Sequence, residues 1–209
     1  MRSKADATLA CAERARAHWN TAEAGIREHA IAIRLIGIAH KLKEDYDAAI
    51  SAYRESLDLF RSESEQSQDV SIALNIVAGA EVLLGDLDGA ERDFREALRI
   101  ARAFGSGEAV ATCTGNLAEL ALDREDWPGA ENLAREALAL SEQVGRQELI
   151  GINCLSLATA LVRQGKRDEA QSYARRAVEI CTRLGHSELE RARATLAACE
   201  SESEKSEER

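Results

Sequence analysis

NLAELALDREDWPGAENLAREA, residues 116–137, is the stretch of sequence that decides the fold, because related versions of it occur before and after. Ala130 within it has counterparts at Ala49, Ala90 and Ala170, so successive copies lie 41, 40 and 40 residues apart. An internal repeat of this period is typical of a solenoid, in which supersecondary units stack on one another instead of surrounding one core. Function is therefore expected on an extended surface rather than in a catalytic pocket.

The composition favours a nearly all-helical chain. The 209 residues include 1 Pro and 4% aromatic residues, and much of the 45% hydrophobic content is Ala, which suits helices that pack closely. The formal charge of −10 argues against nucleic acid as a partner, because binding to phosphates needs a clustered surplus of Lys and Arg. No apolar run approaches 18 residues and no secretory signal is visible, so we expect no membrane association and a cytoplasmic location.

The order of the helices can be predicted from the repeat. A leading helix covers residues 5–18, and Asn20 or Thr21 is expected to cap the next helix. Helix pairs fill four units, a terminal helix covers the last apolar face, and the polar residues 201–209 form a disordered acidic tail. We predict one solenoid domain over residues 1–200, with units at 22–62, 69–104, 107–144 and 147–184 and a cap at 187–200.

The helix boundaries carry their own signals. Gly105, Gly145 and Gly185 each follow a large apolar residue and are expected to end helices in the left-handed conformation. Asp86 and Asp126 precede the second helix of their units, whereas Lys166 replaces Asp in the last unit, which predicts a weaker helix start there.

Aligned with one another, the units resemble tetratricopeptide repeats, whose pattern is a large residue, Leu-Gly, an aromatic, Ala, an aromatic and a small residue. The residues at these positions are Ile33, Ile36, Gly37, His40, Ala49, Tyr53 and Ser56; Leu74, Val77, Ala78, Glu81, Ala90, Phe94 and Ala97; Thr114, Leu117, Ala118, Ala121, Ala130, Ala134 and Ala137; and Cys154, Leu157, Ala158, Leu161, Ala170, Ala174 and Ala177. The resemblance implies a right-handed all-α solenoid of about four helix hairpins, with a leading helix and a C-terminal capping helix.

Two departures distinguish these units from the standard repeat. Their period is about 40 instead of 34 residues, and the Pro that usually ends a unit is absent. Both features are similar to the longer variant found in kinesin light chains, Leu-Gly-Asn repeat scaffolds and bacterial signal-transducing NTPases. In the last group the array is a sensor or docking arm.

The resemblance also implies a concave groove, lined by the first helix of each unit, that holds a peptide or a partner helix. The residues expected to contact the partner are Arg34, Ile38, Lys41, Asn75, Val82, Glu119, Leu122, Ile152 and Thr159. Arg34 fits one place of the clamp that binds C-terminal carboxylates in co-chaperone arrays, but Ile38 stands where that clamp needs Asn. A mostly apolar helix or strand is therefore the expected ligand.

No catalytic, cofactor or metal site is expected. Gly165 and Lys166 lack the rest of a nucleotide-binding loop. His29, His40 and Glu44 lack a recognised metal-ligand spacing, and no group would orient Cys154 and His186 as a nucleophile and base. The five cysteines are scattered and are expected to be buried fillers without disulfides.

Arg54, Arg95, Arg135 and Arg175 occupy one position of all four units, and Glu91 and Glu131 lie four residues before two of them. Ion pairs on a solvated face are the favoured interpretation, and a stripe for an acidic partner is the alternative.

The sequence thus predicts a non-catalytic scaffold for protein–protein interaction, monomeric or weakly self-associating. The alternative is a sensor or regulatory arm that acts with an NTPase or effector protein in bacterial signalling.

Overall fold

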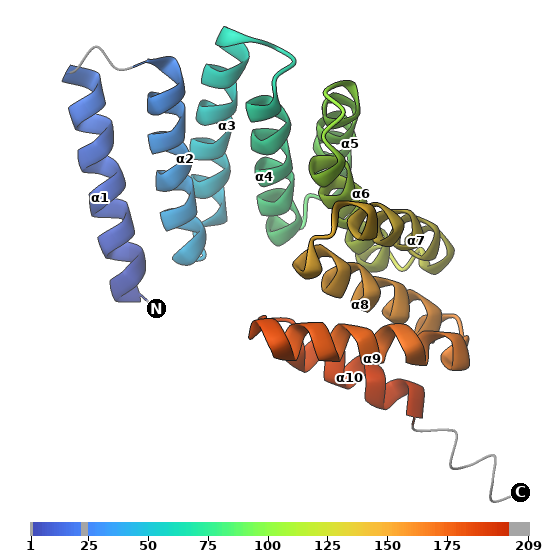
Figure 1. Ribbon diagram of the computed structural model, residues 1–209. Coiled ribbons are helices and arrows are strands. Elements are labelled where there is room, and N and C mark those ends of the chain that lie inside the picture. The colour runs from blue at the N-terminus through green and yellow to red at the C-terminus, as the bar shows by residue number, and fades with distance from the viewer. Residues whose placement is uncertain (1, 22–24, 201–209) are drawn as a thin grey trace, which may run out of the picture. The chain divides into compact units, whose positions relative to one another are not determined.

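Residues 2–21 and 25–200 are described by the computed structural model, and within these ranges every regular element is an α-helix. The chain divides into two compact units, residues 1–105 and 106–209. The predicted fold class, an all-α solenoid of four helix hairpins with a leading and a capping helix, is confirmed (Figure 1). The single domain predicted over residues 1–200 stays a prediction.

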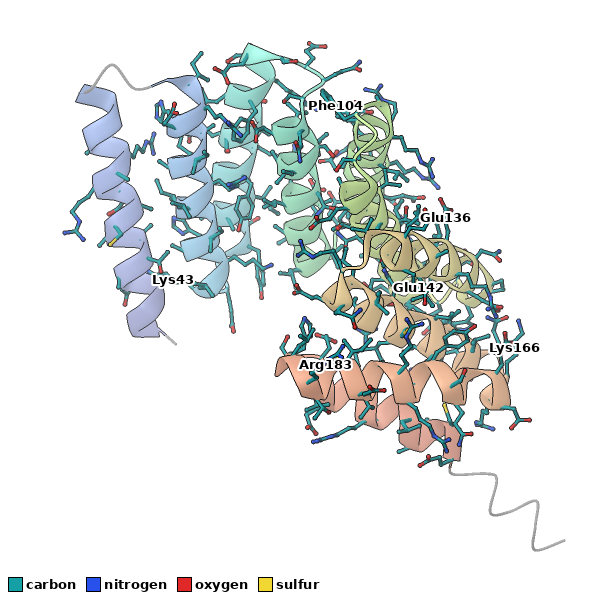
Figure 2. The ribbon with its side chains drawn as sticks, viewed as in Figure 1. Lys43, Phe104, Glu136, Glu142, Lys166 and Arg183 are labelled. Atoms are coloured by element: carbon teal, nitrogen blue, oxygen red, sulfur yellow. The ribbon has the colours of Figure 1, made fainter. Side chains whose placement is uncertain are left out.

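The first unit contains the leading helix and two hairpins, namely α1 (Arg2–Thr21), α2 (Ile26–Leu42), α3 (Tyr46–Glu63), α4 (Gln68–Leu84) and α5 (Leu87–Ala103). Each helix packs against the next one in the chain. Ala12 of α1 shares a buried cluster with Ile33 and Ile36 of α2, so the leading helix covers the first hairpin. Lys43, just after α2, lies 2.6 Å from the carboxylate of Asp6 on α1 (Figure 2).

The second unit contains two hairpins and the capping helix, namely α6 (Gly107–Asp123), α7 (Trp127–Val144), α8 (Gln147–Arg163), α9 (Arg167–Leu184) and α10 (Leu189–Glu200). One buried cluster runs from Ala118 of α6 through Leu157 of α8 to Cys199 of α10. The capping helix packs on both α8 and α9, and it therefore shields the apolar side of the last hairpin.

The glycines and aspartates predicted to end and begin helices do so in the structure. Gly105, Gly145 and Gly185 have φ of 67°, 76° and 62°, in the left-handed region that favours glycine. Asp86 and Asp126 each accept a hydrogen bond at 3.0 Å from the backbone N–H three residues later. The α9 helix has no side-chain cap at Lys166, as its sequence indicated.

One boundary prediction is wrong. Asn20 and Thr21 do not cap the second helix, because α1 continues through Thr21 and α2 begins after Gly25, which makes no side-chain cap. The helix-forming residues of α1 outweigh a local cap signal. The start of the first predicted unit, at residues 22–24, and the tail at residues 201–209 lie outside the described residues.

The small residues of the repeat lie at close contacts between helices. Ala49, Ala90, Ala130 and Ala170 are all 0% exposed. At Gly37 of α2, an added Cβ would stand 2.5 Å from the ring of Tyr53 on α3. Glycine is therefore needed at this point of the first hairpin.

Among the described helices, none has both the length and the hydropathy that crossing a bilayer requires.

Candidate functional site

The first helices of the hairpins carry the residues predicted to contact a partner. In the first unit, Arg34, Ile38 and Lys41 lie on α2, and Asn75 and Val82 lie on α4. Ile38 and Lys41 are exposed, and the other three are partly exposed. All five can therefore contact solvent or a ligand.

Besides the predicted contact Ile38, the α2 and α4 helices expose further large apolar side chains. Leu35, Ile38 and Leu42 are 37%, 36% and 50% exposed, and they recur at the three- and four-residue spacing of one helix face. On α4, Ile72 and Leu83 are 37% and 45% exposed. Leu83 lies 41 residues after Leu42, which is the repeat step here, so the two leucines occupy equivalent positions.

These exposed side chains define an apolar face on each first helix of the first unit. Buried alanines hold the opposite sides of α2 and α4 in the core, so the apolar side chains cannot turn inward. Apolar residues that recur at equivalent exposed positions are typical of a surface that binds another chain. Sequence reasoning could have found them by comparing neighbouring positions of the repeat.

In the second unit, Glu119 and Leu122 lie on α6, and Ile152 and Thr159 lie on α8. Glu119, Ile152 and Thr159 are partly exposed, whereas Leu122 is 8% exposed and packs against Ala130 and Ala160. Leu122 therefore belongs to the core of the hairpin. Thr159 donates to the carbonyl of Leu155, and its Oγ1 lies 3.5 Å from that of Thr195 on α10.

Glu119 is engaged by neighbouring helices. Its carboxylate accepts hydrogen bonds from the hydroxyl of Ser156 on α8 and from the guanidinium of Arg191 on α10. A ligand that bound Glu119 would compete with Arg191. Burial, followed by the charge of Glu119, raises the pKa of nearby Asp123 above its ordinary value.

The character of the first helices differs between the two units. Positions that carry Leu35, Ile38 and Leu42 in the first hairpin carry Asn116, Glu119 and Asp123 on α6. On α8 the same positions carry Ser156, Thr159 and Arg163. The first unit thus offers an apolar surface and the second a polar one.

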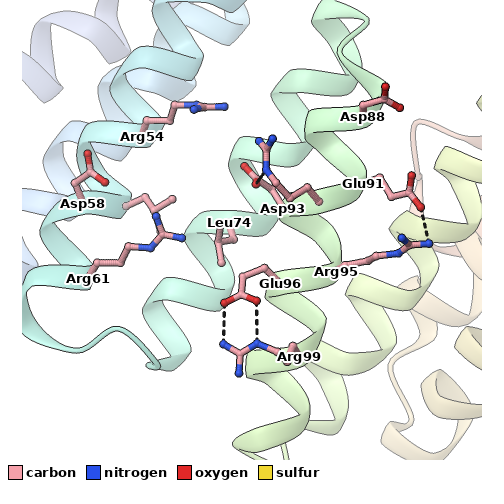
Figure 3. Close-up of a pocket in the computed structure, with 12 residues that line it drawn as sticks. Arg54, Asp58, Arg61, Leu74, Asp88, Glu91, Asp93, Arg95, Glu96 and Arg99 are labelled. Atoms are coloured by element: carbon pink, nitrogen blue, oxygen red, sulfur yellow. Dashed lines mark hydrogen bonds and ion pairs between the residues drawn. The ribbon is translucent and has the colours of Figure 1, made fainter.

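A cleft of about 1090 Å³ lies between α3 and α5 on the second helices of the first unit. Figure 3 shows Arg99 paired twice with Glu96, at 2.8 Å, and Arg95 paired with Glu91, at 2.5 Å. Five arginines and five carboxylates line this cleft, so their formal charges cancel. It offers no general attraction to an acidic partner.

The arginines at the shared repeat position are paired with carboxylates. The predicted pair of Arg95 with Glu91 is present, and Arg135 lies 2.9 Å from Glu131 and 2.5 Å from Glu169. Arg54 reaches Glu81 at 2.5 Å, and Arg175 lies 3.7 Å from Glu200. These contacts support the interpretation as ion pairs rather than a binding stripe.

Glu81 on α4 is a buried carboxyl group that sequence reasoning did not single out. Its side chain is 2% exposed, and burial raises its pKa although Arg54 opposes the shift. The sequence does hint at the burial of Glu81, because Glu81 occupies a position where the repeat pattern has an aromatic residue. The cost of burying this charge makes Glu81 a stability determinant of the first unit.

The His and Cys side chains of the described residues bear on metal binding and on nucleophilic chemistry. No group of three His, Cys, Asp or Glu side chains there could hold a metal ion, and His40 lies 3.4 Å from Asp45. Cys113, Cys154, Cys181 and Cys199 are buried free thiols, whereas Cys11 is exposed. Burial raises the pKa of Cys154 to about 11, which keeps it protonated at neutral pH.

Comparison with known proteins agrees with this geometry. Profiles of the tetratricopeptide repeat match residues 35–63, 69–143 and 154–184. The chain belongs to the tetratricopeptide repeat family. No curated protein matches its sequence significantly.

Solved structures with the same fold include BtubC (BKLC) from P. vanneervenii, which is 22% identical, with a TM-score of 0.73 over 95% of this chain and 81% of that one. The Rap conjugation gene regulator of the plasmid pLS20, solved in complex with the Phr* peptide, is 17% identical, with a TM-score of 0.74 over 87% of this chain and 50% of that one.

A signal transduction ATPase with numerous domains from Pyrococcus horikoshii, which has a tetratricopeptide repeat sensor, is also similar. It is 15% identical, with a TM-score of 0.69 over 84% of this chain and 27% of that one. The chain thus spans half of the Rap regulator and about a quarter of the ATPase.

Proposed function

We propose that the protein is a non-catalytic interaction scaffold whose first helices bind an extended peptide or a partner helix. The observation that carries the proposal is the apolar face of α2 and α4, where Leu42 and Leu83 stay exposed at equivalent repeat positions beside Leu35, Ile38 and Ile72. The peptide-bound Rap regulator, which shares the fold, supports the same mode of use.

The contact residues in the first unit are apolar side chains flanked by cations. Arg34 and Lys41 form no ion pair with any residue of the described chain, and they border Leu35, Ile38 and Leu42 on α2. Asn75 and Val82 extend the surface on α4. A partner with an apolar stripe and acidic flanks is complementary to this face.

In the second unit, Glu119, Ile152 and Thr159 are the proposed contacts. Glu119 already pairs with Arg191. Glu119 therefore adds to the affinity of a ligand only when the ligand supplies a cation that replaces Arg191, which makes Glu119 a determinant of specificity.

Selection from a displayed library of random peptides tests the proposal. We expect the selected peptides to carry apolar residues at helical or alternating spacing and to bind the purified chain. Leu42→Asp or Leu83→Asp should weaken that binding by about tenfold or more, because each charge would be placed against an apolar contact.

Leu184→Asp is the matched control, since Leu184 is 47% exposed but lies at the end of α9. Equal loss of binding in all three variants, or no loss in the first two, would contradict the proposal.

A second candidate is a sensor arm that controls an NTPase or effector protein. The similarity to the repeat-sensor ATPase favours it. If an NTPase gene lies beside the gene for this chain, co-expression of the two products tests this candidate: a sensor arm should alter the nucleotide hydrolysis rate, whereas a scaffold alone should not. Sedimentation at several concentrations would test the expected monomeric or weakly associating state.

A further inference from the structure

The second unit contains a hollow of about 600 Å³ between α8 and α10, of a volume typical of small-ligand sites. Arginines from three helices lie around it: Arg163 ends α8, Arg167 begins α9 and Arg191 lies on α10. Val162, Ala194, Ala198 and two threonines supply the rest of its lining. In a chain with a formal charge of −10, a hollow lined by arginines without a lining carboxylate is unusual.

Arg163 is held in place without being neutralised. Its guanidinium carbon lies 5.4 Å from the ring centroid of Trp127, the first residue of α7. Stacking on an aromatic ring covers one face of a guanidinium but leaves the N–H groups at its edge able to donate. No carboxylate in the described ranges forms an ion pair with Arg163.

Arg191, on the opposite wall, is already compensated. Its guanidinium lies 2.8 Å from Glu119 and 3.3 Å from Glu188. These carboxylates reduce the positive charge available to a ligand, so a singly charged anion matches the hollow better than a doubly charged phosphate.

The position of Arg163 in the repeat is specific to the last hairpin. The equivalent residues are Leu42, Leu83 and Asp123, so a cation stands here in one of four first helices. Because Trp127 supports it from the preceding hairpin, the site depends on this pairing of residues rather than on the repeat pattern alone.

We infer that this hollow binds a carboxylate attached to an apolar group, as at the C-terminal residue of a peptide ending in an aliphatic side chain. Arg163 donates to the carboxylate, and Arg167 at the start of α9 lines the same hollow. Val162, Ala194 and Ala198 contact the aliphatic part. The inference rests on the proposed function, since the carboxylate is assigned to a peptide that the first helices of the second unit bind.

N-acetyl-L-leucine is the probe, and N-acetyl-L-leucine amide is the neutral control of the same shape. We expect the acid to shift the amide resonances of Thr159, Ala194 and Ala198 saturably in ¹⁵N spectra of the full chain. A ligand of this size should have a dissociation constant on the order of 1 mM. The amide should bind at least about tenfold more weakly, because it cannot form the charge-assisted hydrogen bonds.

Arg163→Gln keeps a hydrogen-bonding side chain but removes the charge, and it should also weaken binding of the acid about tenfold. Arg193→Gln on α10 is the matched control, because Arg193 is exposed and does not line the hollow. The spectra report folding of each variant directly. Equal shifts with acid and amide, or equal affinity of the two variants for the acid, would overturn the inference. If the inference is overturned but binding of the selected peptides is still weakened by Leu42→Asp and Leu83→Asp, the proposed function stands.

Discussion

Arg191 on α10 donates to the carboxylate of Glu119 on α6, with Nη2 lying 2.8 Å from Oε2 and 3.1 Å from Oε1. Ser156 on α8 donates to the same carboxylate, so this contact joins the first helices of two hairpins to the capping helix. The capping helix thus has a polar attachment besides its apolar packing on α8 and α9.

The Glu119 and Arg191 pair should contribute about 0.5–1 kcal/mol to the free energy of unfolding, as expected for a partly exposed pair. A double-mutant cycle with Glu119→Gln and Arg191→Gln, followed by urea unfolding, measures this coupling. Because the side chains are 29% and 40% exposed, the coupling should fall at high salt. No coupling at low salt would contradict the role of this contact.

Gly37→Ala should destabilise the protein by about 1–3 kcal/mol, because the new methyl group would displace the ring of Tyr53. Gly79→Ala is the contrasting variant, since an added Cβ there meets nothing within 4 Å. That variant should stabilise α4 by about 0.5–1 kcal/mol through helix propensity. Thermal unfolding of both variants checks the prediction, and the same sign for both would refute it.

Glu81 should make the protein more stable as the pH falls through its raised pKa. Its pKa is raised in the folded state by burial, so the folded chain takes up this proton at a higher pH than the unfolded chain does. The gain should be complete below the ordinary pKa of 4.5 and lost as pH rises through the raised value.

Urea unfolding of the wild type and of Glu81→Gln at a series of pH values tests this role of Glu81. The gain in the free energy of unfolding at low pH should be absent from the variant. Glu63→Gln, at the end of α3, is a control in which this gain in stability should remain.

Arg54→Met should lower the free energy of unfolding by about 2 kcal/mol at pH 7, because it leaves the buried carboxylate of Glu81 without its donor.

Glu131, in the second unit, should make the protein less stable as the pH falls. Lys166, Arg135 and Gln164 donate to it at 2.6, 2.9 and 2.8 Å, and these bonds, with that of Lys166 largest, lower its pKa to about 2. Its contribution is present above the ordinary pKa of 4.5 and is lost as the pH falls toward 2. Glu131→Gln should flatten this part of the stability profile, and an unchanged acid limb would contradict the assignment.

The sequence predicted the hairpins well because their boundaries depend on local chemistry. The left-handed glycines and the caps at Asp86 and Asp126 act within one helical turn, so each repeat shows them. The cap expected near Asn20 failed because helix propensity along α1 outweighs a single polar side chain. The profile matches confirm the family that the aligned small residues indicated.

The candidate site was harder to predict because it depends on contacts between helices. The pairing of Arg191 with Glu119 joins residues 72 positions apart, and the stacking of Arg163 on Trp127 joins two hairpins. Leu122 was expected on the surface, yet it packs against Ala130 of α7 and Ala160 of α8 in the core. Periodicity gives the helix face to within about one residue, whereas exposure depends on which neighbour covers it.

Site-specific photocrosslinking tests the central claim most directly. Benzoylphenylalanine is placed either at position 38 on α2 or at position 51 on α3. Both positions are exposed, but only position 38 lies on the proposed binding face. With a peptide obtained by library selection, the account predicts crosslinks from position 38 and none above background from position 51. Crosslinks from position 51 alone, or equal yields from both positions, would contradict it.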